Sequence, residues 1–199
     1  MTIPTWDSAY SGEAPPPWDI GRPQPVFVRL CGQGLLSGRV LDVGCGTGEH
    51  ALLAASQGAD ATGIDLSQLA IDRARAKAAE RDLPARFEVG DVLSLDRLGS
   101  GAFDTVIDSG LFHVFSDEER GRYVASIASV LAPGGHCYLM CFSNMQPGDF
   151  GPRRVRQEEL RAAFSDGWAV ESITAEQFEV NRDFGMTSAQ AWLGTFRRI

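Results

Sequence analysis

The sequence contains little from which a metal centre or a disulfide framework could be built. Only four cysteines and three histidines occur among its 199 residues, and no two cysteines form a C-x-x-C pair. Cys137 and Cys141 share an expected strand, whose rise per residue separates them by about 13 Å, too far for a disulfide. We therefore predict no metal site and interpret the cysteines as small buried apolar residues, with Cys45 as the exception because it lies in a glycine-rich loop.

Positive charge is also scarce. Lysines and arginines number 18 against 26 aspartates and glutamates, which gives a formal net charge of -8. Such a surface repels a phosphate backbone unless its basic residues gather on one face. The single dense basic run is RRVR at 153–156, which we interpret as a solvated loop. We therefore expect no nucleic-acid partner.

Long apolar runs and targeting segments are missing as well. No apolar run approaches the length needed to cross a bilayer. The opening stretch, MTIPTWDSAYSGEAPPPWD, is acidic and proline-rich, without the positively charged start and apolar core of a signal peptide. We expect a cytoplasmic protein with no membrane partner.

What the sequence does contain is a regular alternation of strand and helix patterns over 39–142. The expected strands cover 39–43, 59–66, 85–92, 103–110 and 134–142. The expected helices cover 25–36, 48–58, 67–82 and 116–135. This alternation predicts an α/β fold with a doubly wound, mostly parallel sheet and right-handed crossovers.

The length fits one domain over 1–199, with an N-terminal segment over 1–24 and a core over 25–199. After a short expected helix at 157–164, two strand-like runs at 168–180 and 189–199 follow with no helix between them. We therefore predict that these two strands form an antiparallel pair at the sheet edge.

Three glycines, Gly44, Gly46 and Gly48, follow the first strand and precede a helix. A glycine-rich turn at this place lets a ligand approach the backbone closely. The spacing is G-x-G-x-G, which differs from the dinucleotide fingerprint G-x-G-x-x-G, and no P-loop lysine follows. The acidic neighbours Asp42 and Glu49 further disfavour a bound phosphate.

Acidic residues stand at the tips of three consecutive strands. Asp42 is placed to meet an ammonium group, Asp65 the vicinal hydroxyls of a ribose, and Asp91 an adenine amino group. Each of them alone is also explained as a turn residue. Together with the glycine loop, however, the row suits S-adenosylmethionine, which carries all three of these groups.

These pieces resemble the class I S-adenosylmethionine-dependent methyltransferases. The matching motifs are VLDVGCGTGEH, GIDLS, GDV, FDTVIDSG and LAPGGHCYLM, which cover about half of the chain. The resemblance implies a Rossmann-like sheet of seven strands with one antiparallel C-terminal strand, and S-adenosylhomocysteine as the product. The predicted cofactor-binding residues along these motifs are Asp42, Gly44, Cys45, Gly46, Gly48, Asp65, Leu66, Asp91, Val92, Asp108 and Ser109. Asp108 stays open between a cofactor contact and a structural carboxylate.

The opening YSGEAPPPWDIGRPQP further resembles a bacterial subgroup of small-molecule methyltransferases, related to thiopurine, tellurite-resistance and heterocyclic-toxin enzymes. By analogy with this subgroup, the N-terminal segment is expected to fold over the cofactor as a lid. Tyr10 or Trp18 would lie near the methionine part and Arg22 near its carboxylate, and Asp19 is a candidate base. The alternative is a hydrophobic strap packed on the sheet edge, to which Trp6 would belong.

His113 is the second candidate catalytic residue, in the loop that leaves the fourth strand. It is either satisfied by a neighbouring carbonyl or engaged in acceptor binding or general-base catalysis. The adjacent Phe112 and Phe115 are expected in the core more than in a substrate wall.

We therefore predict a methyltransferase that acts on a thiol, hydroxyl or ring nitrogen of a small aromatic or heterocyclic molecule, in detoxification or secondary metabolism. The motif DSGLFH replaces the N/D-P-P-Y/F motif of adenine and protein-amide methylation. An NAD-dependent oxidoreductase and a non-catalytic adenosylmethionine-binding protein are the alternatives. The chain is expected to be a monomer or a homodimer.

Overall fold

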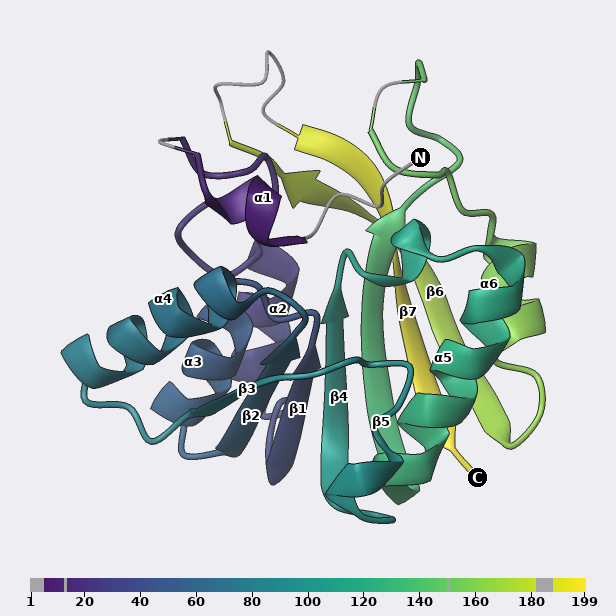
Figure 1. Ribbon diagram of the computed structural model, residues 1–199. Helices are drawn as coiled ribbons and strands as arrows, with labels where there is room; N and C mark the ends of the chain where they lie inside the picture. Colours follow the sequence, from purple (N-terminus) through teal and green to yellow (C-terminus); the bar gives the residue numbers. More distant parts are fainter. Residues whose placement is uncertain (1–5, 13, 150, 182–187) are drawn as a thin grey trace.

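Seven strands form one sheet in the order β3-β2-β1-β4-β5-β7-β6 (Figure 1). The computed structural model describes residues 6–12, 14–149, 151–181 and 188–199. The strands are β1 Arg39–Val43, β2 Asp60–Asp65, β3 Arg86–Val89, β4 Phe103–Ser109, β5 Leu131–Phe142, β6 Trp168–Glu179 and β7 Ser188–Arg198.

Only β7 runs against its neighbours in this sheet. β1 pairs in parallel with β2 and β4, β2 with β3, and β4 with β5, whereas β7 is antiparallel to both β5 and β6. The predicted seven-stranded, mostly parallel sheet with one antiparallel C-terminal strand is therefore confirmed. The direction of winding reverses between β1 and β4, so a ligand crevice is expected at their carboxyl ends.

The sheet buries a separate apolar core on each face, because alternate residues of a strand point to opposite faces. Val40 belongs to the core beneath α2, α3 and α4, whereas Leu41 belongs to the core beneath α5 and α6. The helices are α2 Pro25–Gly32, α3 Glu49–Ser56, α4 Gln68–Glu80, α5 Asp117–Val130 and α6 Gln157–Ala163.

Helix α5 begins as predicted and ends earlier than predicted. The Ser116 side chain accepts from the backbone N–H of Glu119, whose carboxylate accepts from the Ser116 N–H in return, which forms a capping box. The helix ends at Val130, and the buried Leu131 already opens β5. The expected helix over 116–135 was thus too long. Pro133 keeps the residue before it extended, so the chain enters the strand directly.

The basic run at 153–156 begins against acidic side chains. Arg153 forms ion pairs with Asp117 at 2.6 Å and with Glu159 at 2.6 Å, which neutralise its charge locally.

No helix in the described part of the chain is long and apolar enough to cross a membrane.

The N-terminal segment lies over the upper edge of the sheet in Figure 1, where it forms the short helix α1 Trp6–Tyr10. The Asp7 carboxylate accepts from the Ser67 hydroxyl at 2.6 Å and from the Leu69 N–H at 3.2 Å. Asp7 thus satisfies free N–H and O–H donors at the start of α4, which attaches α1 to that helix. Two short 3-10 helices, η1 Asp96–Leu98 and η2 Phe112–Val114, complete the described elements.

Candidate active site

A cavity of about 740 Å³ opens at the edge of the sheet where the parallel strands end. The ends of β1, β2, β4 and β5 border it, and residues 6–12 and 14–24 together with the end of β6 cover it. We call the part lined by 44–47, Asp65 and Asp91 the glycine-loop half. It lies at the switch point that the strand order defines.

The glycine loop adopts a backbone that side chains would obstruct. Gly44, Gly46 and Gly48 have φ values of 63°, 52° and 86°, in the left-handed region that favours glycine. A Cβ on Gly46 would stand 2.9 Å from the Tyr10 hydroxyl, and one on Gly48 would stand 2.6 Å from the Phe87 ring. The loop therefore leaves no room for side chains at these two positions, either toward Tyr10, which lines the cavity, or toward Phe87.

Asp65 fastens this loop to the end of β2. One carboxylate oxygen accepts from the Gly46 N–H at 2.9 Å, and the other accepts from the Ser67 N–H at 2.8 Å. Each oxygen keeps lone-pair capacity for a further donor. Burial raises the pKa of Asp65, while these backbone bonds oppose that rise. The carboxylate lines the cavity, where the sequence predicted a ribose contact.

Asp42 has a different position from the one that the sequence suggested. Its side chain is 1% exposed, is not among the residues that line the cavity, and accepts from the Ala51 N–H near the start of α3. Its other oxygen has no hydrogen-bond partner in the described part of the chain. Burial raises the pKa of Asp42 to about 8. Asp42 is therefore placed to support the loop from behind, without facing a ligand.

Gly48 is not among the residues that line the cavity, whereas the remaining predicted residues of the loop and of the ends of β2, β3 and β4 are. The group comprises Cys45, Leu66, Asp91, Val92 and Ser109. Asp91 is exposed, and its carboxylate accepts from the Leu93 N–H at 2.9 Å in a local turn. It offers one oxygen to a ligand at the outer end of the cavity.

Asp108, a predicted cofactor residue, forms its hydrogen bonds within the protein. Its carboxylate accepts from the N–H groups of Leu111 and Phe112 and from the Tyr123 hydroxyl, at 2.8, 3.1 and 2.5 Å. The side chain is completely buried, is not among the cavity-lining residues, and has a pKa raised to about 6 by that burial. Of the two roles left open by the sequence, its position favours the structural one.

His113 lines the cavity from the loop after β4. Its Nδ1 accepts from the Phe142 N–H at 3.0 Å, so the neutral ring carries its proton on Nε2. Burial, with smaller contributions from Arg120 and Arg154, lowers the pKa of His113 to about 3. The ring is therefore a neutral hydrogen-bond donor. A backbone N–H satisfies it, in place of the carbonyl that the sequence suggested.

Aromatic rings surround His113 and form what we call the aromatic half of the cavity: His113, Phe115, Phe142 and Phe178. The ring centroids of Phe142 and Phe178 lie 5.1 and 6.1 Å from that of His113. Phe112 is fully buried in the core, as expected, whereas Phe115 lines the cavity. Sequence reasoning missed Phe142 and Phe178, although both stand where a strand reaches the same edge of the sheet.

The N-terminal segment supplies a cluster of aromatic side chains to the cavity. The Trp18 indole N–H donates to the Tyr10 hydroxyl at 3.0 Å, and the Trp6 and Trp18 rings meet edge to face at 6.4 Å. Burial raises the pKa of Tyr10, so its hydroxyl stays a donor at neutral pH. All three side chains line the cavity.

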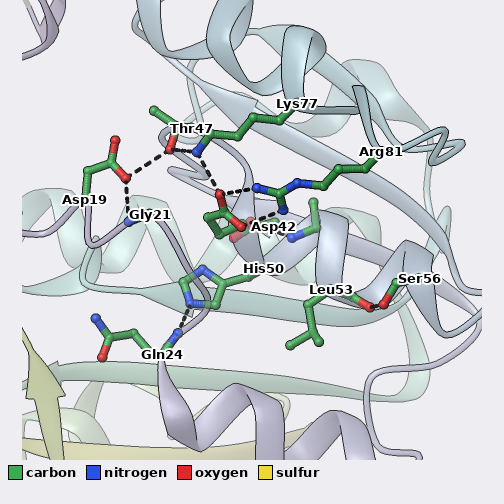
Figure 2. A network of polar contacts seen from close by, with 12 residues as sticks. Asp19, Gly21, Gln24, Asp42, Thr47, His50, Leu53, Ser56, Lys77 and Arg81 are labelled. Carbon is green, nitrogen blue, oxygen red and sulfur yellow. Dashed lines mark hydrogen bonds and ion pairs between the residues drawn. The ribbon is translucent and has the colours of Figure 1, made fainter. Parts of the chain in front are cut away.

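A second part of the segment is tied to β6. Arg22 lines the cavity and forms an ion pair with Glu179, and the Gln24 side chain bonds both the N–H and the carbonyl of Glu179 at 2.9 Å. The Gln24 N–H donates to Nε2 of His50 at 3.1 Å (Figure 2). The predicted role of Arg22 at a ligand carboxylate thus competes with a carboxylate of this chain.

Asp19 lies on the glycine-loop side of the cavity. Figure 2 shows it on one side of Thr47, with Lys77 and Arg81 on the other. The Thr47 hydroxyl bonds the Asp19 carboxylate at 3.1 Å and accepts from the Lys77 ammonium at 2.7 Å. Lys77 and Arg81 both pair with the buried Glu49.

The glycine-loop half fits a nucleoside that carries an amino acid. The loop keeps its backbone free of side chains at the glycines. Asp65 offers a carboxylate at the predicted ribose position, and the aromatic side chains of the N-terminal segment line the cavity as well. Lys77 and Arg81, two cations beside the loop, are already paired with Glu49, so neither is free to bind a phosphate. The fold and the cavity thus suit an α/β protein that binds a nucleoside cofactor without phosphate groups.

Comparisons with known proteins identify the family. The methyltransferase domain family matches residues 40–135. The chain is 39% identical over 187 residues to a 2-heptyl-1-hydroxyquinolin-4(1H)-one methyltransferase of Mycobacteroides abscessus, covering 89% of this chain and 82% of that protein. The chain therefore belongs to the class I S-adenosylmethionine-dependent methyltransferases, of the small-molecule type, and S-adenosylmethionine is its cofactor.

Two further similarities agree with this assignment. A solved structure from work on the conversion of a disulfide bond into a thioacetal group during echinomycin biosynthesis superposes with a TM-score of 0.88, at 39% identity, covering 97% of this chain and 91% of that one. A probable thiol methyltransferase of Arabidopsis thaliana is 26% identical, covering 94% of this chain and 83% of that protein.

Proposed function

We propose that this methyltransferase acts on an acidic hydroxyl or thiol of a small, planar aromatic or heteroaromatic molecule. The observation that carries the proposal is the neutral, donor-presenting His113 within the wall formed by Phe115, Phe142 and Phe178. Flat apolar rings favour stacking and edge-to-face contacts with an aromatic acceptor. The His113 N–H, which lies among these rings, favours a methyl acceptor with an oxygen or sulfur atom that can accept its hydrogen bond.

The protonation state of His113 argues against a role as general base. A ring whose pKa is about 3 and whose Nδ1 already accepts from the Phe142 N–H has little affinity for a further proton near neutral pH. An acceptor that ionises on its own, such as a thiol or an N-hydroxy group on a heterocycle, needs no strong base. The His113 N–H would then stabilise the resulting anion.

The names of the relatives support the same acceptor class. The Mycobacteroides abscessus protein is named for a hydroxyquinolone, and the Arabidopsis thaliana protein for thiols. The prediction from sequence also includes a ring nitrogen as a methyl acceptor, in addition to a thiol and a hydroxyl. The alternatives considered there, an NAD-dependent oxidoreductase and a protein that only binds the cofactor, do not match the family that the comparisons identify.

The chain itself has to align the two reactants and to keep water away. When bound, the cofactor supplies a methyl group on a sulfonium, which is already activated for in-line displacement. The glycine loop and Asp65 hold the nucleoside end, and the aromatic half orients the acceptor. The N-terminal segment acts as the lid, because Tyr10 and Trp18 close the cavity from above.

The test is release of S-adenosylhomocysteine by the purified protein across four matched acceptor sets: 1-hydroxyquinolin-4-ones, aromatic thiols, simple phenols and N-heterocycles. We expect turnover on the first two sets. We also expect kcat/KM to rise with pH through the pKa of each acceptor, because the acceptor supplies the ionised atom. Turnover restricted to weakly acidic phenols would contradict the proposal, since such acceptors require an enzyme base.

A further inference from the structure

The carboxylate of Asp19 stands at the glycine loop, where the amino-acid end of the cofactor has to be held. We propose that Asp19 binds the α-ammonium group of S-adenosylmethionine, the role that was predicted for Asp42. This inference rests on the cofactor assignment and is independent of the acceptor. It also gives Asp19 a different role from the general base predicted from the sequence.

Asp19 is held in place before any ligand arrives. Its N–H donates to the Pro16 carbonyl at 3.0 Å, at the end of a run of three prolines. Its Oδ1 accepts from the Thr47 hydroxyl at 3.1 Å and from the Gly21 N–H at 3.3 Å (Figure 2). The fixed proline backbone lowers the entropy lost on ordering this turn. A carboxylate positioned in this way costs little to reorganise when it binds a cation.

Thr47 determines which way the hydrogen bond runs. A hydroxyl has one proton, and the Thr47 oxygen already accepts from the Lys77 ammonium at 2.7 Å. The Thr47 proton is therefore directed at Asp19, which stabilises its carboxylate form. Thr47 is a positioning residue that links the glycine loop to the lid.

The other carboxylates around the loop are less suited to an ammonium group. Glu49 is already paired with both Lys77 and Arg81. Each Asp65 oxygen is engaged by a backbone N–H, at the ribose position. Asp42 is buried behind the loop and is not among the residues that line the cavity.

Asp19, by contrast, lines the cavity and receives only neutral donors, both on Oδ1. No hydrogen bond to its Oδ2 and no ion pair of its side chain is found in the described part of the chain. An ammonium group that met Oδ2 would form a charge-assisted hydrogen bond under the cover of Tyr10 and Trp18. The positive end of the cofactor would thus be held by the lid and not by the sheet.

Two ligands separate this role from a general effect on the lid. S-adenosylhomocysteine carries the ammonium group, and 5′-methylthioadenosine lacks the whole amino-acid part. Titration calorimetry with both ligands should show that Asp19→Asn weakens S-adenosylhomocysteine binding about 10- to 100-fold. Binding of 5′-methylthioadenosine should stay within about twofold, which also shows that the variant is folded.

Matched variants sharpen the result. Asp91→Asn should weaken both ligands equally, because its predicted contact is to the adenine that they share. Thr47→Val should reproduce part of the Asp19→Asn effect, and Thr47→Ser should restore it, because only the hydroxyl orients the carboxylate.

Three outcomes would overturn the inference. Unchanged S-adenosylhomocysteine affinity in Asp19→Asn together with reduced turnover would return Asp19 to the role of base. An equal loss for both ligands would indicate a general effect on the lid. A loss of affinity for S-adenosylhomocysteine, but not for 5′-methylthioadenosine, in Asp42→Asn and not in Asp19→Asn would assign the group to Asp42. Failure of the wild-type protein to bind either ligand would instead contradict the cofactor assignment itself.

Discussion

The glycine-loop half and the aromatic half of the cavity are made of different kinds of atoms. In the first, backbone with positive φ at Gly44, Gly46 and Gly48 is fastened by Asp65. In the second, the side chains of Phe142 and Phe178 converge on His113 from strands that follow much later in the chain. A backbone-built half tolerates almost no added atom, whereas a side-chain-built half can change its rings and keep its fold. Substitutions in the aromatic half can therefore alter acceptor binding while the backbone that holds the cofactor stays unchanged.

The largest expected effect is on the backbone of the glycine loop. Gly48→Ala places a Cβ 2.6 Å from the Phe87 ring and 2.9 Å from the Ala74 side chain, at a φ of 86°. Left-handed strain and overpacking together should lower the free energy of unfolding by about 3 kcal/mol, measured by urea denaturation. Gly58→Ala is the matched control, because its φ is 87° and its Cβ would meet nothing within 4 Å.

The control variant should lose only the backbone contribution, about 1 to 2 kcal/mol. An equal loss at both glycines would show that the loop is not tightly packed, and the contrast between the two halves would then be weaker.

A smaller effect is expected from the buried histidine of the aromatic half. The folded-state pKa of His113 is about 3, below the ordinary value of 6.5, so the unfolded chain binds the extra proton between these values. Stability from this group is full above pH 6.5 and is lost as pH falls toward 3. His113→Asn keeps a side-chain acceptor for the Phe142 N–H but does not titrate.

Between pH 7 and pH 5 the wild type should therefore lose about 2 kcal/mol more of its unfolding free energy than His113→Asn. The difference between the two proteins is the informative quantity, because His50, with a pKa of about 4, and the buried Asp42 and Asp108 contribute to both. Parallel pH profiles would mean that His113 is not held neutral.

Next in size is the effect of the aromatic wall on the acceptor. Phe142→Leu removes a ring that packs against both His113 and Phe178 but leaves the side chain apolar. We expect the acceptor KM to rise about 5- to 10-fold, roughly 1 kcal/mol, from lost aromatic contacts. The affinity for S-adenosylhomocysteine should stay within about twofold. A comparable loss of cofactor affinity would show that the two halves are not separate.

The backbone-built half of the cavity could be predicted from the sequence more fully than the half built from side chains. Strand and glycine patterns are local, so the sheet, its antiparallel strand and the loop could be predicted from short stretches. Asp42 and Asp65 both stand near the end of a buried strand, yet only Asp65 lines the cavity. Asp42 differs because its carboxylate accepts a hydrogen bond from the Ala51 N–H near the start of α3. The alternation of residues along a strand does not predict which of two carboxylates forms such a bond.

The aromatic half was harder to predict because its members are far apart in sequence. Applying the strand-end rule to every strand would have found Phe142 at the end of β5 and Phe178 near the end of β6. No comparable rule identifies Thr47 as the partner of Asp19, since that contact depends on how the N-terminal segment crosses the loop.

The smallest expected effect is at the outer end of the glycine-loop half. Asp91 is exposed, and its carboxylate already accepts from the Leu93 N–H, so a hydrogen bond to an adenine amino group there competes with water. Asp91→Asn should weaken S-adenosylhomocysteine binding about threefold, roughly 0.7 kcal/mol. Because the asparagine oxygen can still accept from Leu93, the turn should persist. A loss above about 30-fold would mean that a side chain, and not the backbone, dominates this half as well, and the contrast between the two halves would fail.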